Sequence, residues 1–263
     1  MSGFSAAWLA LREPADLAAR SDVVTQAVVS ALADVPHARL VDLGSGAGSN
    51  VRFLSARLHG SHEWLLVDDD AALLQIAARS STAAVSTRVH DLRHLDPSLV
   101  VGRHLVTASA LLDLVSGAWL DDLVRQCRQA AAQVLFALNY DGRLSCTPAD
   151  PHDDFVRDAV NRHQRGDKGF GPALGPSAGV EAARRLEAAG YRVVRERSDW
   201  TLDGRQAELQ RQLIAGWALA ATEIAPADAG EIDAWRQRRL ALVARGTSIV
   251  TVGHDDVAGV LRP

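Results

Sequence analysis

Short apolar runs alternate along the first 140 residues with stretches in which apolar positions recur every three or four residues. The runs predict buried strands, because they are too uniformly apolar for a sheet with one solvated face. The three- and four-residue spacing predicts amphipathic helices between them. Expected strands are 39–43, 64–67, 84–90, 104–109 and 133–138, and expected helices are 49–58, 70–79 and 118–131. This order predicts an α/β fold, a Rossmann-like doubly wound sheet that is mostly parallel.

The flanking segments predict additional helices around this sheet. Residues 6–34 have helical spacing, and Pro14 is expected to divide them into two helices. Residues 140–176 are polar and then rich in glycine and proline, which predicts a helix followed by a long loop. Further elements are expected as helices at 177–189, 204–224 and 228–244 and as strands at 191–194 and 247–252. We expect one domain over 1–263, with a helical cap (1–36), a core (37–139) and two insertions (140–176 and 203–245).

Composition narrows the class of protein. The 263 residues are 48% hydrophobic and 23% charged, with a net charge of −4, which disfavours nucleic-acid binding through a general basic field. Cys127 and Cys146 have no metal-site spacing, so no metal is expected and a reducing cytoplasm is favoured. The N-terminus has no signal-peptide pattern and no apolar run reaches the ~18 residues that span a bilayer. A cytoplasmic protein without a membrane partner is therefore expected.

The stretch RLVDLGSGAGSN, residues 39–50, contains three glycines between a predicted strand and a predicted helix. Glycine lets a ligand lie against the backbone, and this place is where parallel sheets bind ligands. The dinucleotide fingerprint G-x-G-x-x-G would need a glycine at Ser49, and no GK[ST] sequence follows. The spacing therefore disfavours a phosphate ligand and an NAD-dependent oxidoreductase. A tight turn that binds nothing is the simpler alternative.

The same stretch resembles the first motif of the class I S-adenosylmethionine-dependent methyltransferases of the bacterial small-molecule type. The resemblance covers 37–139 well, and 177–200 with 247–253 more loosely. It implies seven strands with the last antiparallel, and S-adenosylmethionine as cofactor. In this family the glycine loop supports the methionine part and the ribose, and an acid lies near the cofactor's amino group. These roles would fall to Gly44, Ser45, Gly46 and Gly48 in the loop and to Asp42.

Other cofactor residues are implied at the following strand ends. Asp68 ends the second strand, about 20 residues beyond the glycines, where a carboxylate accepts from ribose hydroxyls. Asp69 is assigned with it, although helix capping is the simpler explanation of Asp69 and Asp70. The resemblance further places Asp91 at the adenine amino group and the Leu92 amide at a ring nitrogen. It places Ser109 to Leu112 beneath the cofactor, with Leu111 or Leu112 packing on it. A solvated side chain at Asp91 and plain core at the leucines are the simpler alternatives.

Catalytic and acceptor residues depend on the acceptor, because methyl transfer requires mainly positioning and needs a base only when a proton must leave. Asp113 and His163 are the catalytic candidates, and Tyr140, His163 and Phe170 are candidates for acceptor contacts. A helix-starting acid, a solvated histidine and a turn explain Asp113, His163 and Tyr140 equally simply. The two insertions would form the acceptor pocket and its lid. Three charged residues of the cap would close over the cofactor or remain surface charges: Arg12, Glu13 and Arg20.

The sequence thus predicts methyl transfer to a small-molecule acceptor. The alternative is a non-catalytic protein of the same fold that binds the cofactor or a nucleoside. A nucleic-acid partner is not expected, because the sequence has no basic or aromatic stripe. The methylated atom, the acceptor and the oligomeric state do not follow from the sequence.

Overall fold

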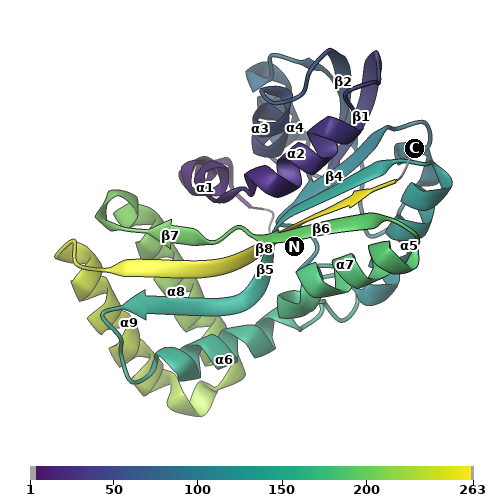
Figure 1. Cartoon of the computed structure of the whole chain (residues 1–263). Coiled ribbons are helices and arrows are strands. Elements are labelled where there is room, and N and C mark those ends of the chain that lie inside the picture. The colour runs from purple at the N-terminus through teal and green to yellow at the C-terminus, as the bar shows by residue number, and fades with distance from the viewer. Residues whose placement is uncertain (1–3, 262–263) are drawn as a thin grey trace.

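The computed structural model describes residues 4–261 and contains one mixed sheet (Figure 1). The strand order is β3-β2-β1-β4-β5-β8-β6, and the short β7 pairs with β8. Strands β3, β2, β1, β4 and β5 run parallel, whereas β8 is antiparallel to β5, β6 and β7. The strands are β1 (His37–Leu43), β2 (Ser61–Asp68), β3 (Ala84–Val89), β4 (Leu105–Ser109), β5 (Gln133–Thr147), β6 (Arg192–Arg197), β7 (Trp200–Leu202) and β8 (Ile249–Val260). The predicted fold class is confirmed, with eight strands in place of seven because β7 is added.

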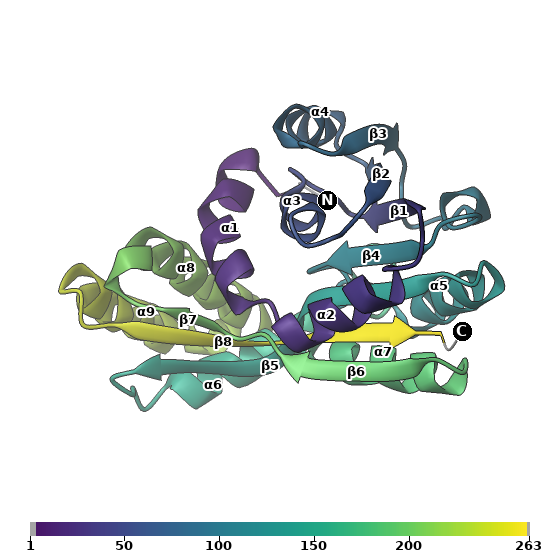
Figure 2. The ribbon, with the colours of Figure 1, turned by 45° about the horizontal axis from the view of Figure 1, so that its top comes forward.

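Helices cover both faces of the parallel part of the sheet, as Figures 1 and 2 show. One face packs on α2 (Asp22–Ala31), α3 (Ser49–Ser55) and α4 (Ala71–Ser80). The other packs on α5 (Gly117–Gln129) and α7 (Ala178–Ala188). Alternate residues of β1 serve the two faces, since Val41 lies in one core and Leu40 in the other. The doubly wound arrangement follows from strands that are apolar on both sides.

Strands β5 and β8 extend far beyond the predicted ends at 138 and 252. Their pairing shifts register between Phe136 and Asn139, next to Leu138 with φ of +53°. The Oδ1 of Asp256 accepts from the Leu138 amide over 2.7 Å, so the irregular backbone is held by a side chain of the neighbouring strand. The sequence does not predict this part of the strand, because its residues are polar and their hydrogen-bond partners come from distant segments.

The extended halves of β5 and β8 carry a second helical layer that lies apart from α3 and α4 (Figures 1 and 2). It consists of α6 (Asp153–Gln164), α8 (Ala207–Ile224) and α9 (Ala229–Ala244), packed around a core of its own. Insertion 140–176 is therefore a strand extension, a helix and a shorter loop. None of the helices in the part of the chain that the structure describes is long and apolar enough to cross a membrane.

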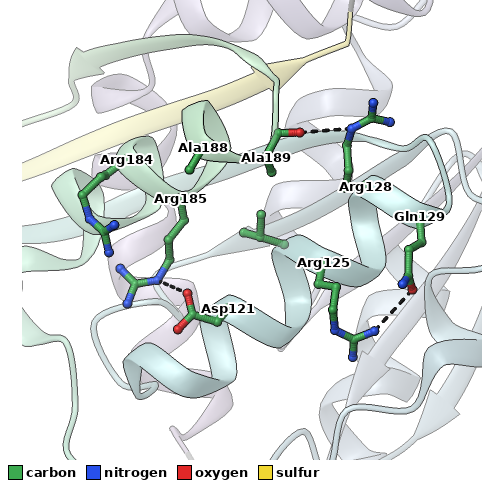
Figure 3. A pocket seen from close by; sticks show the side chains of 9 residues that line it. Asp121, Arg125, Arg128, Gln129, Arg184, Arg185, Ala188 and Ala189 are labelled. Atoms are coloured by element: carbon green, nitrogen blue, oxygen red, sulfur yellow. Dashed lines mark hydrogen bonds and ion pairs between the residues drawn. The ribbon is translucent and has the colours of Figure 1, made fainter.

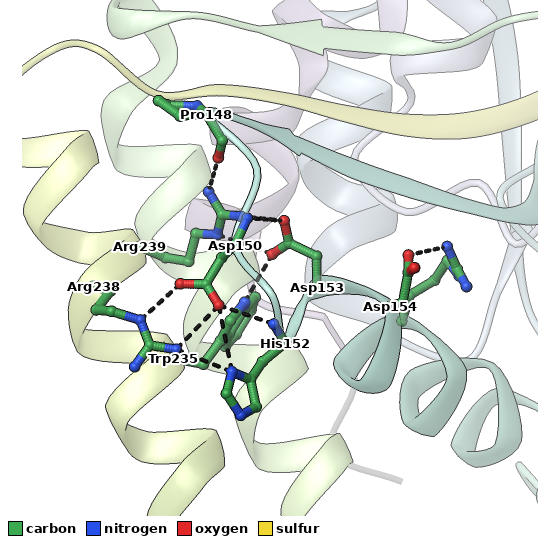
Figure 4. A network of polar contacts seen from close by, with 9 residues as sticks. Pro148, Asp150, His152, Asp153, Asp154, Trp235, Arg238 and Arg239 are labelled. Atoms are coloured by element: carbon green, nitrogen blue, oxygen red, sulfur yellow. Dashed lines mark hydrogen bonds and ion pairs between the residues drawn. The ribbon is translucent and has the colours of Figure 1, made fainter.

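A buried ion pair joins these helices to the end of β5 (Figure 4). Arg239 of α9 is fully buried and pairs with Asp153 at the start of α6, while its guanidinium also donates to the carbonyl of Pro148. The indole Nε1 of Trp235 donates to the same carboxylate over 2.9 Å. Removing one partner would leave a buried charge unpaired, so this network fixes α9 against α6.

The N-terminal cap differs from the prediction in one respect. Pro14 lies inside a continuous α1 (Ala6–Ala19), and the chain breaks at Arg20 and Ser21. The Ser21 hydroxyl accepts from the Val24 amide and caps α2, which fixes the break there. Figures 1 and 2 show α1 between α3 and α8 of the second helical layer.

Candidate functional site

A cavity of about 1180 Å³ opens at the carboxyl ends of β1, β2 and β4. Parallel sheets bind ligands at this edge. Its walls come from α1, the glycine loop, the β2–α4 and β3 loops, the segment after β4, the end of α6 with its following loop, and α8. Of the predicted residues it includes Asp42, Gly44, Ser45, Gly46, Asp68, Asp69, Asp91, Leu92, Ser109, Leu111, His163 and Phe170.

The glycine loop is held rigidly below this cavity. The amides of Gly44 and Ser45 donate to the Val67 carbonyl over 2.8 and 3.0 Å. The Ser45 hydroxyl donates to the Asp42 carbonyl and accepts from the Val67 amide. Gly44 and Gly46 have φ of +68° and +48°, a region that favours glycine. A side chain on Gly44 would contact Leu111, so the missing side chain leaves the floor of the cavity open.

Gly48 was predicted to bind the cofactor, but it does not line the cavity. It begins α3 with φ of +82°, and an added Cβ would lie 2.9 Å from the Cβ of Ala77. Its lack of a side chain therefore allows α3 and α4 to pack closely. The third glycine of the motif thus serves helix packing.

Asp42 is buried beneath the loop with one oxygen free. Its Oδ1 accepts from Asn50 Nδ2 over 2.8 Å, whereas Oδ2 has no hydrogen-bond partner within residues 4–261. Burial raises the pKa of Asp42 to about 7, although the bond from Asn50 acts in the opposite direction. A buried acceptor without a donor, on a cavity wall, indicates a place for a cationic or hydrogen-bonding ligand group.

The three acids after β2 have different surroundings. Asp68 Oδ2 accepts from the Gly46 amide over 2.7 Å and Oδ1 from the Asp70 amide over 3.0 Å, and burial raises its pKa. Asp70 caps α4, since its Oδ1 accepts from the amides of Ala72 and Leu73. Asp69 lines the cavity and does not cap that helix. The capping alternative thus holds for Asp70 and is wrong for Asp69.

Asp91 and Leu92 lie side by side at another part of the wall. Both oxygens of Asp91 accept from Arg93, which lowers the pKa of that carboxyl to about 2. The Leu92 carbonyl accepts from Trp119 Nε1 over 2.6 Å, and its amide has no hydrogen-bond partner in the described chain. Phe170 and Trp119 pack nearly perpendicular to each other, with ring centroids 5.9 Å apart. Phe170 therefore lies beside Leu92 on the cavity wall.

Asp113, the first catalytic candidate, is buried just outside the cavity lining. Its Oδ1 has no hydrogen-bond partner among the described residues. Burial raises the pKa of Asp113 to about 6, and the charges of Arg12 and Lys168 partly offset this. A carboxyl with this pKa can hold or take a proton near neutral pH.

His163, the second catalytic candidate, lines the cavity with both ring nitrogens engaged. Its Nε2 lies 2.9 Å from Glu223 Oε2, and its Nδ1 lies 3.4 Å from Lys168 Nζ. An ammonium group only donates, so Nδ1 accepts and the ring proton is assigned to Nε2. Both ring nitrogens of His163 therefore have partners.

Tyr140, predicted to contact the acceptor, lies away from the cavity. It is buried in the second core, and its hydroxyl donates to Asn161 Oδ1 over 2.8 Å. Burial, with the charge of Asp141 acting in the same direction, raises the pKa of Tyr140 above its usual range. Because β5 continues through Tyr140 as a strand, this side chain faces the second helical layer.

Sequence reasoning missed the contributions of Asn50 and of Leu9 in α1. Leu9 lies against the glycine loop, and an added Cβ on Gly46 would be 3.1 Å from its Cδ1. Glu13 pairs with Arg52, whose Nη1 donates to the Ala47 carbonyl of the loop. Surface charge is therefore the wrong reading of the cap residues: Arg12 and Glu13 line the cavity, and Arg20 is buried with Asn50 and Asp256.

A second hollow of about 410 Å³ lies between α5 and α7 (Figure 3). Four arginines line it, and Arg185 pairs with Asp121 while Arg128 donates to the Ala189 carbonyl. None of the predicted site residues belongs to it. The cavity at the strand ends is therefore the candidate site.

The sheet order, with one antiparallel strand inserted between β5 and β6, is that of the class I methyltransferase fold. No protein-family model and no curated protein matches the sequence significantly. Among solved structures, YcgJ from Bacillus subtilis is 12% identical, with 92% of this chain and 100% of that chain covered and a TM-score of 0.50. A proposed methyltransferase from Bacillus halodurans is 10% identical, with 90% and 99% covered and a TM-score of 0.50.

A third structure, an S-adenosylmethionine-dependent methyltransferase from Geobacter sulfurreducens in complex with S-adenosylhomocysteine, is 16% identical. Both chains are fully covered, with a TM-score of 0.46. The first two matches establish that this chain has the methyltransferase fold. At such identities the likeness concerns the fold alone.

Proposed function

We propose that this protein binds S-adenosylmethionine in the cavity and transfers its methyl group to a small molecule. The observation that carries the proposal is the buried, unpartnered Oδ2 of Asp42 on the wall beside the glycine loop. An ammonium group is the ligand group that best satisfies such an oxygen. Asp68 and the free amide of Leu92 line the same cavity and would supply the acceptors and the donor that a nucleoside needs.

The charges around the cavity suit a cationic cofactor. Asp42, Asp68 and Asp69 line its cofactor part, and Arg93 neutralises only Asp91. Asp42 would hold the amino group, Asp68 and Asp69 the ribose hydroxyls, and Leu92 an adenine nitrogen. Leu111 would support the cofactor from below, next to Ser109. Phe170 would cover the adenine, because it packs on the tryptophan that binds the Leu92 carbonyl.

When bound, the cofactor supplies a methyl group on a positively charged sulfur, which leaves as a neutral thioether. The chain must exclude water and hold the acceptor in line, an effect that can contribute about 7–11 kcal/mol. Asp113 is the group of this chain that could receive a proton, through a donor that reaches its free Oδ1. Arg12, fixed by Asp16 through bonds of 2.9 and 3.1 Å, would bound the space between cofactor and acceptor.

The second helical layer and α1 would form the acceptor side of the cavity. His163, Lys168 and Leu219 come from this layer, and Phe4 and Leu9 from the N-terminal segment. The segment 165–174 then serves both sides, since Phe170 lies at the adenine end and Lys168 beside His163. The cap, the loop and α8 together would act as the lid.

Calorimetry with S-adenosylhomocysteine tests the cofactor assignment, with NAD as the control ligand. A ligand that binds the folded state alone stabilises it by about 2.7 kcal/mol at a hundredfold excess over its Kd. Absence of heat and of any melting shift at millimolar S-adenosylhomocysteine contradicts the proposal.

Methyl-labelled cofactor and a metabolite extract then test catalysis. Label in a small-molecule fraction is expected. Binding without any transfer of label would instead support the non-catalytic alternative.

A further inference from the structure

The acceptor side of the cavity contains the only lysine of the chain. Lys168 is the single lysine among 28 lysines and arginines. It lies in the loop after α6 and lines the cavity. A compact ammonium is a point charge with three donors, whereas arginine presents a planar fork. Because every other basic residue counted here is an arginine, the lysine at this position indicates a need for a compact ammonium group.

The ammonium group of Lys168 is anchored without a carboxylate. Its Nζ donates to the His163 carbonyl over 3.1 Å and lies 3.4 Å from His163 Nδ1. No ion pair within 4 Å joins Lys168 to an acid in residues 4–261, whereas Glu223 binds the opposite side of the imidazole. Two of three donors are therefore accounted for, and one remains for a ligand.

The charged side chains that α1 contributes to this end are paired. Arg12 is bound by Asp16 through two hydrogen bonds, and Glu13 is paired with Arg52. Lys168 is therefore the one cation of the acceptor wall that contacts no carboxylate among the described residues. A ligand that enters here meets a positive charge whose position is fixed by the end of α6.

Apart from Gln164, the remaining wall at this end is apolar. Phe4 and Leu219 are 53% and 64% exposed at the cavity, and Leu114 lines it from the segment after β4. Exposed apolar side chains beside a ligand cavity indicate contact with an apolar group of the ligand. An acceptor that suits this end combines an apolar body with one negative group.

We infer that Lys168 recognises an anionic group, a carboxylate or a phosphate, on an acceptor with an apolar body, and that His163 and Glu223 position it. That the bound molecule is a methyl acceptor rests on the proposed function, whereas the anion site itself does not. Glu223 orients the imidazole through Nε2, and Nδ1 then receives the ammonium. His163 is thus a positioning residue and not a base.

Three probes of one shape test the inference: phenylacetate, phenyl phosphate and neutral phenylacetamide, titrated calorimetrically into the protein saturated with S-adenosylhomocysteine. At least one anion should bind about tenfold more tightly than the amide, since hydrogen bonds to charged groups exceed neutral ones. The preferred anion distinguishes a carboxylate from a phosphate. In Lys168→Gln this preference should disappear, and Lys168→Arg should retain part of it.

Arg165→Gln is the matched control, because Arg165 is an exposed cation three residues away that does not line the cavity. It should leave the preference unchanged. Glu223→Gln should weaken anion binding severalfold without affecting S-adenosylhomocysteine. Equal binding of anion and amide, no binding of either anion at millimolar concentration, or an unaltered preference in Lys168→Gln overturns the inference.

Two outcomes separate this inference from the proposed function. If S-adenosylhomocysteine does not bind, the proposed function fails, and the anion preference is measured on the free protein. If Lys168→Gln weakens S-adenosylhomocysteine as much as the anion, then Lys168 holds the cofactor's carboxylate and the acceptor inference is overturned.

Discussion

Asn50 donates a hydrogen bond of 2.8 Å from its Nδ2 to Oδ1 of Asp42, and both side chains are buried. The Asn50 Oδ1 in turn accepts from Arg20 over 2.7 Å, and Arg20 pairs with Asp256 of β8. The orientation of Asp42 is thus set by a chain of side chains that begins in the cap and ends in the sheet.

Asn50→Ala should weaken S-adenosylhomocysteine binding by about tenfold, because Asp42 loses the donor that orients it. Calorimetry measures this directly. Asn161→Ala is the control, since that amide binds Tyr140 and the Gly142 carbonyl outside the cavity. Equal losses of affinity in the two variants would show that Asn50 acts only through general stability.

Cofactor affinity should rise with pH through about 7. The pKa of Asp42 is raised to about 7 by burial, so the carboxylate that attracts an ammonium group is depleted below that pH. Affinity should fall about tenfold for each pH unit below the pKa. Binding isotherms from pH about 5.5 to 8.5 test this, and the slope should vanish in Asp42→Asn. A wild-type profile that is flat across this range contradicts the assigned role.

Asp68→Ala and Asp70→Ala should separate ligand binding from helix capping. Asp68 holds the Gly46 amide and lines the cavity, so its loss should lower affinity by one to two decades, from about 1.5–3 kcal/mol. Asp70→Ala should cost about 1 kcal/mol of stability and leave affinity nearly unchanged. Calorimetry and denaturant unfolding on both variants give the comparison. The reverse order of affinities would show that the acids after β2 are wrongly assigned.

Gly48→Ala should destabilise the fold without altering the cavity. Its φ of +82° and the 2.9 Å approach of an added Cβ to Ala77 both oppose a side chain. The αL conformation alone costs an alanine about 1–2 kcal/mol. Denaturant unfolding measures the loss of stability. Affinity for S-adenosylhomocysteine below the unfolding transition should stay within severalfold of wild type, and a larger loss would return Gly48 to the cofactor site.

Asp113→Asn should increase stability at alkaline pH and reduce turnover. The pKa of Asp113 is raised to about 6, so ionisation of the folded protein is unfavourable and its stability falls as pH rises from about 4 to 6. Asparagine removes that dependence, a gain of about 1–3 kcal/mol above pH 6 that is absent near pH 4. Melting curves at both pH values measure the gain, and label transfer measures turnover. Full turnover in the variant would exclude Asp113 as the proton acceptor.

The sequence predicts the parallel core well because strands such as β1 are apolar on both faces and end at the glycine loop. It does not predict the length of β8, since Asp255 and Asp256 in its middle read as a break. They are tolerated because Arg195 and Arg20 pair with them, and sequence distance conceals such pairs.

The cofactor side and the acceptor side of the cavity likewise differ in how far the sequence predicts them. Asp42 and Asp68 follow strands, so their place at one edge is predictable from the alternation of elements. Arg12 and Asp16 form a pair four residues apart that looks like any exposed helix pair. Only the docking of α1 against the loop and the second layer brings them to the cavity.

Because β5 and β8 carry both the core that packs on α5 and α7 and the core of the second helical layer, neither core can melt without disturbing strands that hold the other. The chain should therefore lose its structure in one cooperative step, although it contains separate cores. Stabilisation of the glycine loop by a ligand is then transmitted to α9, far from the ligand.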